Sequence, residues 1–198
     1  MKTKNKALLL ALCAVSLVTA SVFGTMAYLT DNKKVTNTFT VGSVAITMDE
    51  TDVDGNAGRD TENSYKLLPG QTYTKDPIIH VDPTSEECFL FVKVENEIAN
   101  IEADGSKVAS QMAEKGWKLV KDNVYVYIGT ESGASAPVAV KANANITVFE
   151  KIKIADSVSG TQLADYKGKT IKVTAYAVQK AGFEGKAADE IWNTAFSA

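Results

Sequence analysis

The residues best suited to bind a ligand gather in one acidic stretch, residues 49–63. Its six carboxylates are Asp49, Glu50, Asp52, Asp54, Asp60 and Glu62. The spacing Glu50-x-Asp52-x-Asp54-Gly55 matches the oxygens that open an EF-hand loop, but position twelve is Thr61, where a bidentate Glu belongs. Two interpretations follow: a calcium site in a calcium-dependent adhesive module, or a solvated loop between strands. We expect the loop, with no metal ligand and no cofactor.

Catalytic chemistry would depend on very few residues. The chain has one histidine, His80, and two cysteines, Cys13 and Cys88. A zinc protease site needs about three protein ligands, usually with more than one imidazole, and no His-Glu-x-x-His occurs. Any Ser-His-Asp or Cys-His arrangement would have to use His80 as well. We therefore expect no catalytic residues and no enzymatic activity. His80 is expected to be a hydrogen-bonded structural residue. Cys88, in phase with Leu90, is expected to be a buried inert thiol; pairing between molecules would require its exposure.

The elements that position these groups are expected to be strands, because alternating apolar residues recur along most of the chain. We predict strands at residues 35–48, 73–81, 88–94, 117–120, 124–128, 137–140, 146–154 and 171–179. Helical segments are predicted at 106–115 and 187–196, with one helical turn at 163–166. Short, closely spaced strands with helices only as insertions favour a mainly β protein, an antiparallel β-sandwich.

Three local features refine this prediction. The apolar phase within 35–48 changes at Gly42-Ser43, which predicts a bulge or bend. Pro77 indicates an edge strand or a strand start within 73–81. Ser106 is a candidate N-cap for the inserted helix near 105–116, and Gly116 is expected to end it.

The N-terminus has the pattern of an export signal. Lys2, Lys4 and Lys6 precede an uncharged apolar run over residues 7–24, and Thr25-Met26-Ala27 supplies small residues at a cleavage site. A transmembrane anchor is the alternative, because 18 uncharged residues nearly span a bilayer. We predict a signal peptide at 1–27, cleaved after Ala27, and a single secreted domain at 28–198.

The sequence around this cleavage site resembles that of the TasA/camelysin family. The resemblance is carried by Gly24-Thr25-x-Ala27-x-x-x-Asp31 and then Asn37-x-Phe39-x-Val41-Gly42. Over the rest of the chain, segments such as 149–154 and 175–179 resemble clostridial alternate signal-mediated exported proteins. The resemblance implies export through a SipW-type signal peptidase, a jelly roll fold and membership of a group that includes biofilm-matrix fibre subunits. It also raises the alternative of a camelysin-type metallopeptidase.

Charge narrows the range of partners. The precursor has 21 basic and 24 acidic residues, and removal of the signal leaves 18 against 24. A mildly acidic chain without basic clusters argues against nucleic acid, and after cleavage against a membrane surface. We therefore expect a structural protein of the cell surface or biofilm matrix that self-associates into fibres. The mature N-terminus, residues 28–41, would be the strand exchanged between copies.

Overall fold

The computed structural model describes residues 43–55 and 58–196. The described residues all belong to the second of the chain's two units, residues 41–198. Within the described part of the chain, no helix has the length and apolar character needed to cross a membrane. The predicted signal peptide, the predicted strand segment 35–41 and Gly42 of the predicted phase change lie outside the described residues.

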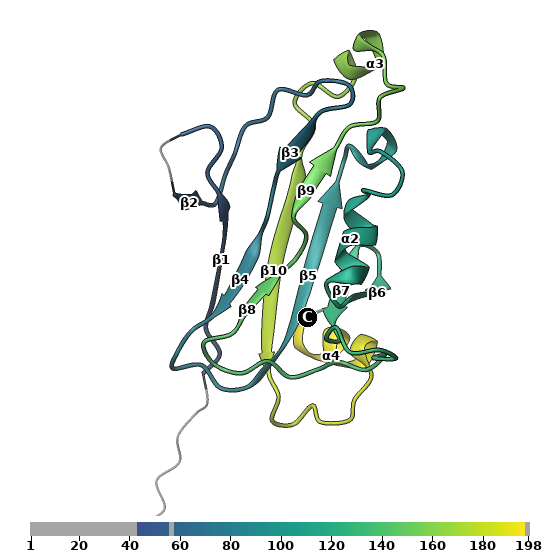
Figure 1. The fold of residues 1–198 in the computed structure, drawn as a ribbon. Coiled ribbons are helices and arrows are strands. Elements are labelled where there is room, and N and C mark those ends of the chain that lie inside the picture. The colour runs from purple at the N-terminus through teal and green to yellow at the C-terminus, as the bar shows by residue number, and fades with distance from the viewer. Residues whose placement is uncertain (1–42, 56–57, 197–198) are drawn as a thin grey trace, which may run out of the picture. The chain divides into compact units, whose positions relative to one another are not determined.

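Two four-stranded antiparallel sheets form most of the second unit (Figure 1). The first sheet has the order β2-β1-β4-β8, with β1 at Ile46–Thr51, β2 at Arg59–Asp60, β4 at Ile78–Val81 and β8 at Asn145–Thr147. The second has the order β10-β5-β7-β6, with β5 at Cys88–Asn96, β6 at Trp117–Lys121, β7 at Val124–Tyr127 and β10 at Ile171–Gln179. A two-stranded sheet pairs β3 (Thr72–Thr74) with β9 (Lys151–Lys153). The predicted class is confirmed at this level: mainly β with antiparallel sheets, few short helices and a C-terminal helix.

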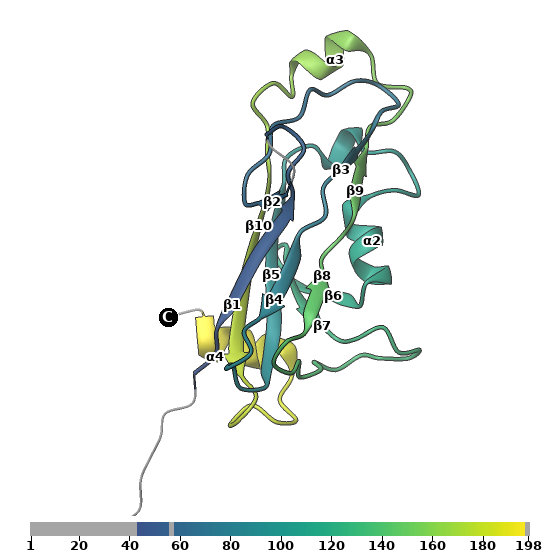
Figure 2. The same cartoon turned by 60° about the vertical axis from the view of Figure 1, so that its left-hand side comes forward.

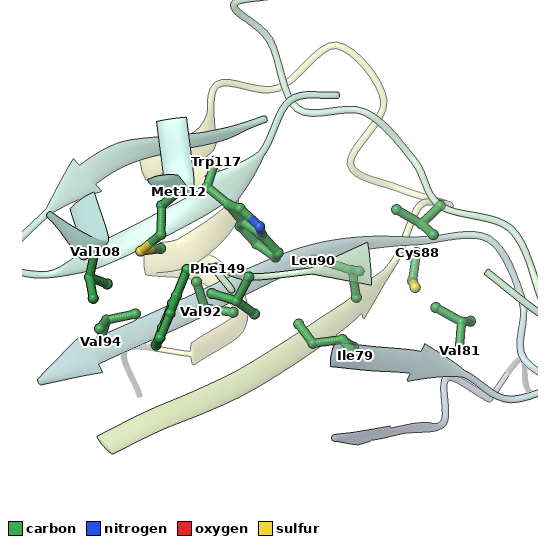
Figure 3. Packing of buried hydrophobic residues seen from close by; sticks show 12 residues of the cluster. Ile79, Val81, Cys88, Leu90, Val92, Val94, Val108, Met112, Trp117 and Phe149 are labelled. Atoms are coloured by element: carbon green, nitrogen blue, oxygen red, sulfur yellow. The ribbon is translucent and has the colours of Figure 1, made fainter. Parts of the chain in front are cut away.

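The main core lies between the two large sheets. Even-numbered residues of β5, including Leu90 and Val92, are fully buried against Ile79 of β4 and Phe149. Figure 3 shows these side chains with Met112 and Trp117 in one cluster. The predicted phase of the strand at 88–94 is therefore confirmed, because side chains two residues apart point to the same face.

A second core covers the opposite face of β5. Phe89 and Phe91 of β5 pack against Ile191 and Trp192 of helix α4 (Ala188–Phe196). The predicted C-terminal helix at 187–196 is thus confirmed. The long strand β5 is buried on both faces, which explains its nearly continuous apolar sequence.

Two predicted strands are each divided between two sheets, and in this respect the prediction was wrong. Residues 73–81 form β3 and β4, which separate just before Pro77, a residue with no N–H to donate. Residues 146–154 form β8 and β9 around the buried Phe149. The predicted strand at 137–140 is reduced to a single bridge between Val140 and Cys88.

The helices also show where local sequence was misleading. Helix α2 (Val108–Glu114) begins after Lys107, so the prediction of Ser106 as its N-cap was wrong. Instead, the buried carboxylate of Glu102 accepts the Val108 N–H at 3.1 Å. Gly116 follows α2 with a φ of +85°, as the predicted helix stop requires. Helix α3 (Gly160–Ala164) begins with a Ser159–Gln162 capping box and starts earlier than the predicted turn at 163–166. A short 3-10 helix, η1 (Ala99–Ile101), follows β5.

Candidate functional site

The acidic stretch folds in two parts. Residues 49–51 belong to β1, so the predicted loop begins later than expected. Three later carboxylates, from Asp52, Asp54 and Asp60, place one oxygen each within 4.8 Å of one another. Glu50 does not join them, so the acidic residues of the EF-hand-like spacing do not all come together. Three carboxylates supply only about half of the six to eight oxygens that calcium takes. Asp52 Oδ1 also accepts the N–H groups of Asp54 and Gly55, at 3.1 and 2.7 Å.

Arg59 fixes this loop to the sheet. It is the only arginine of the chain. Its guanidinium forms ion pairs with Asp49 and with Asp76, the latter at 2.9 Å, and also donates to the carbonyl oxygens of both residues. Asp76 in turn accepts the Thr51 N–H at 2.7 Å and the Thr51 hydroxyl at 2.9 Å. Bidentate guanidinium contacts of this kind hold a fixed geometry, so β1, β2 and the start of β4 are bound together.

A buried ionic centre lies beside these Arg59 contacts. The Lys75 ammonium donates to both carboxylate oxygens of Glu50, at 2.9 and 2.7 Å. The Asn63 amide donates to the same Glu50 Oε1 at 3.1 Å. The side chains of Lys75 and Glu50 are only 11% and 7% exposed. The centre therefore brings together an amine, a carboxylate and a carboxamide in a site largely shielded from water.

His80 lies on β4 between two acceptor groups. Its Nδ1 is 2.6 Å from Asn145 Oδ1 on β8, and its Nε2 is 3.1 Å from Asp49 Oδ2 on β1. The bond to Asn145, followed by the one to Asp49, raises the pKa of His80 above its usual 6.5. The prediction that His80 is hydrogen-bonded is confirmed by its contact with Asn145. Within residues 43–55 and 58–196, His80 belongs to no group of three side chains suited to hold a metal ion.

Cys88 is fully buried at the start of β5, as predicted. Desolvation raises the pKa of its thiol to about 11. Because the thiolate is the reactive form, burial of this kind lowers the reactivity of the sulfur.

The free edge of β10 is the largest unpaired backbone surface in the described sheets. The bonds from Lys180 N–H to Glu87 O, 2.8 Å, and from Glu97 N–H to Thr170 O, 3.1 Å, fix the alternation of the β5–β10 ladder. Even-numbered residues of β10 bond to β5, so the odd-numbered ones direct their N–H and C=O groups outward. These are Ile171, Val173, Ala175, Ala177 and Gln179. We call this row of groups the β10 edge.

Apolar side chains beside the β10 edge are incompletely covered. Val173, Ala175 and Ala177 face the main core, yet each is only half-buried, and the same holds for Ile46 and Met48 of β1. In both views, β1 and β10 lie on the same side of their respective sheets (Figures 1 and 2). The two strands thus border one partly covered apolar margin.

The opposite edge of the second sheet is built differently. Strand β6 is shorter than β10, and its register shifts between Leu119 and Lys121. It also carries the exposed Lys118. Bulges and lysines are devices that discourage pairing at a sheet edge, so β10 is the better acceptor of an added strand.

A polar depression of about 420 Å³ lies next to α3. Its lining includes Glu102, Asp104, Lys107, Gln162 and Tyr166. Lys107 pairs with Asp104 at 3.0 Å, and Glu102 is already bonded to Asn96 and Val108. Lys107 and Glu102 are therefore already bonded within the chain.

Sequence reasoning singled out Glu50 but missed its partners. Lys75 lies 25 residues away along the chain, and no spacing rule links it to Glu50. Arg59 carried one readable signal, since it is the sole arginine within an acidic stretch. Comparison of the chain with protein-family models, with curated proteins and with solved structures finds no match.

Proposed function

We propose that this protein is an exported structural protein of the cell surface or biofilm matrix that assembles into fibres by strand exchange. In this proposal a SipW-type signal peptidase cleaves after Ala27, as the resemblance to the TasA/camelysin family implies. Residues 28–198 then form one jelly-roll-like β-sandwich. The observation that carries the proposal is the β10 edge, which no strand of the described part of the chain pairs with, and its incompletely covered apolar margin.

The strand that fits this edge is the mature N-terminus of a second copy. Residues 28–34 are a polar lead, and seven extended residues reach about 23 Å, enough to pass from one domain to the next. They are followed by Val35, Phe39 and Val41, which lie in one alternating phase. Backbone bonds to the β10 edge would provide affinity, and these side chains would cover the apolar margin.

Apolar burial gives this exchange its driving force. Each of the three donor side chains gains about 1.5–3 kcal/mol when it is fully buried. Donation from one copy to the next is head-to-tail, so the contact repeats without closing and produces filaments. The competing arrangement is residues 28–41 pairing with the β10 edge of their own domain, which would leave a monomer.

The test combines electron microscopy and size-exclusion chromatography of the secreted protein over a range of concentrations. Wild type should form filaments, and a version lacking residues 28–41 should not. Ala175→Pro should also abolish filaments, because it removes an outward N–H from the β10 edge while sparing the ladder to β5. The matched control is Leu119→Pro at the β6 edge, which should still assemble.

Several outcomes would overturn the proposal. A wild type that remains monomeric, or a truncated form that still makes filaments, excludes exchange of residues 28–41. Chelator-sensitive cleavage of casein by a non-assembling protein would favour the camelysin-type peptidase instead. Assembly that requires calcium would favour the adhesive module.

A further inference from the structure

The buried centre of Glu50, Lys75 and Asn63 has the composition of a self-crosslinking site. A primary amine and a carboxamide contact the same carboxylate oxygen, Glu50 Oε1, at 2.9 and 3.1 Å. Because both nitrogens touch one oxygen, the lysine and the asparagine side-chain ends are neighbours. An amine held beside an amide carbon in a fixed geometry is the arrangement that accelerates acyl transfer within a molecule.

Two of the three groups of the centre, Glu50 and Lys75, are shielded from water. Glu50 is 5% exposed as a residue. The Tyr65 ring lies alongside, with its centroid 5.8 Å from Lys75 Nζ, and its hydroxyl donates to Thr74 O at 2.9 Å. Desolvation also raises the pKa of the Tyr65 hydroxyl well above its usual value. A dry site removes the competing hydrolysis of an activated amide.

The Asn63 amide is held in place by hydrogen bonds at both its oxygen and its nitrogen. Its carbonyl oxygen, Oδ1, accepts the Val53 N–H at 2.7 Å, a contact that polarises the carbon and would stabilise the negative charge of a tetrahedral intermediate. Its nitrogen, Nδ2, donates to Glu50 Oε1, to Thr51 O at 3.0 Å and to Asp60 Oδ1 at 3.2 Å. The carbonyl group of the amide, which would be attacked, and its nitrogen, which would leave, thus have separate hydrogen-bond partners.

We propose that Lys75 and Asn63 form an intramolecular isopeptide bond, with Glu50 as the proton carrier. Glu50 takes a proton from the Lys75 ammonium, and the free amine attacks Asn63 Cγ. The Nζ–Cγ bond forms and the Cγ–Nδ2 bond breaks. Glu50 passes protons from the attacking nitrogen to the departing one, which leaves as ammonium. The carboxylate is regenerated, no oxidant or reductant is needed, and the chain loses the mass of one ammonia.

Peptide mapping by tandem mass spectrometry of the purified, denatured protein tests this directly. We expect a branched peptide in which the segment containing Asn63 is joined to the one containing Lys75, lighter than their sum by one ammonia. Trypsin should fail to cleave after Lys75, while cleavage after Lys66 remains normal. The measurement does not depend on where the N-terminus of the purified chain lies.

Three variants separate the crosslink from other chemistry. Lys75→Arg keeps the charge beside Glu50 but removes the nucleophile, and Glu50→Gln removes the proton carrier; both should lack the branched peptide. Lys66→Arg is the matched lysine control and should retain it. A succinimide at Asn63 would cause the same mass loss, but it would persist in Lys75→Arg and yield no branched peptide.

The mapping of wild type decides the question even if a variant folds poorly. Recovery of unlinked Asn63 and Lys75 peptides at full mass, both from fresh protein and after prolonged incubation, would overturn the proposal and leave a buried ion pair. Loss of ammonia that survives in Lys75→Arg would overturn it as well.

Discussion

Replacing Phe91 with Ala tests whether β5 is truly buried on both faces. Phe91 is fully buried, and its ring centroid lies 5.6 Å from that of Trp192 and 5.8 Å from that of Phe196, both on α4. Removal of a buried phenyl ring costs its transfer free energy and leaves a cavity, so the free energy of unfolding should fall by about 3–5 kcal/mol.

Neighbouring positions on the same strand calibrate this result. Leu90→Ala removes a fully buried side chain from the main core and should cost about 2–5 kcal/mol. Lys93→Ala should change stability little, because the Lys93–Glu95 ion pair is 38% and 45% exposed at its side chains. Alternation alone would rank Phe91 with Lys93, whereas the packing of α4 ranks it with Leu90.

The assay is urea unfolding followed by circular dichroism, extended to a double-mutant cycle with Trp192→Ala. The two aromatic side chains should couple by about 0.5–1.5 kcal/mol. A Phe91→Ala loss as small as that of Lys93→Ala, or no coupling to Trp192, would refute the packing of α4 on β5.

Three further predictions concern His80, Arg59 and Gly116. Because the pKa of His80 is raised in the folded state, its stabilising contribution is complete below the usual histidine pKa of 6.5 and is lost as pH rises through the folded-state pKa. The urea midpoint should therefore fall towards alkaline pH in wild type but not in His80→Gln. Arg59→Lys should speed hydrogen exchange at the Thr51 and Asp52 amides, with β5 unchanged, because Lys cannot contact Asp49 and Asp76 together. Gly116→Ala should lower the free energy of unfolding by more than about 2 kcal/mol in thermal melts, because the positive φ alone costs about 1–2 kcal/mol and the new Cβ would lie 2.4 Å from Gly129 O. Gly105→Ala, where the new Cβ would meet open space, should show only the backbone cost.

Local alternation was sufficient to predict the elements whose neighbours lie in one sheet. The strands at 88–94 and 171–179 pair with each other along their length, so neither changes sheets within its apolar sequence. The hairpin of β6 and β7 was also readable, because Asp122 and Asn123 favour the positive φ values of 38° and 65° that its tight turn adopts. In these cases the signal and its cause are both local.

The divided strands could not be predicted from the same pattern. Between β8 and β9, Val148 and Phe149 are both fully buried, so apolar residues continue through the place where the chain changes sheets. The Gln111 side chain of α2 accepts the N–H groups of Glu150 and Lys151, at 3.2 Å each. A helix distant in sequence thus satisfies the backbone at the break, and no local signal records it.

The candidate sites show the same limit. The spacing of Glu50, Asp52 and Asp54 is a local pattern, but β1 carries Glu50 away from the aspartates and towards Lys75. Burial then favours pairing with a cation over coordination at the surface, because an unpaired buried carboxylate is costly. The chemistry of Glu50 was therefore decided by a tertiary contact that the spacing could not reveal.

The two proposals meet in strand β1, although each can fail without the other. If residues 28–41 are donated to a neighbouring copy, tension along the fibre enters each domain at the start of β1. The strand resists it first through its pairing with β4, from Ile46 to Asp49. Beyond that lie the Thr51–Asp76 bonds and the Glu50–Lys75 centre. A covalent link between Asn63 and Lys75 would stop the segment after β1 from separating from β3 and β4. In a fibre loaded through its N-terminal strand, a strong constraint would be most useful at this place.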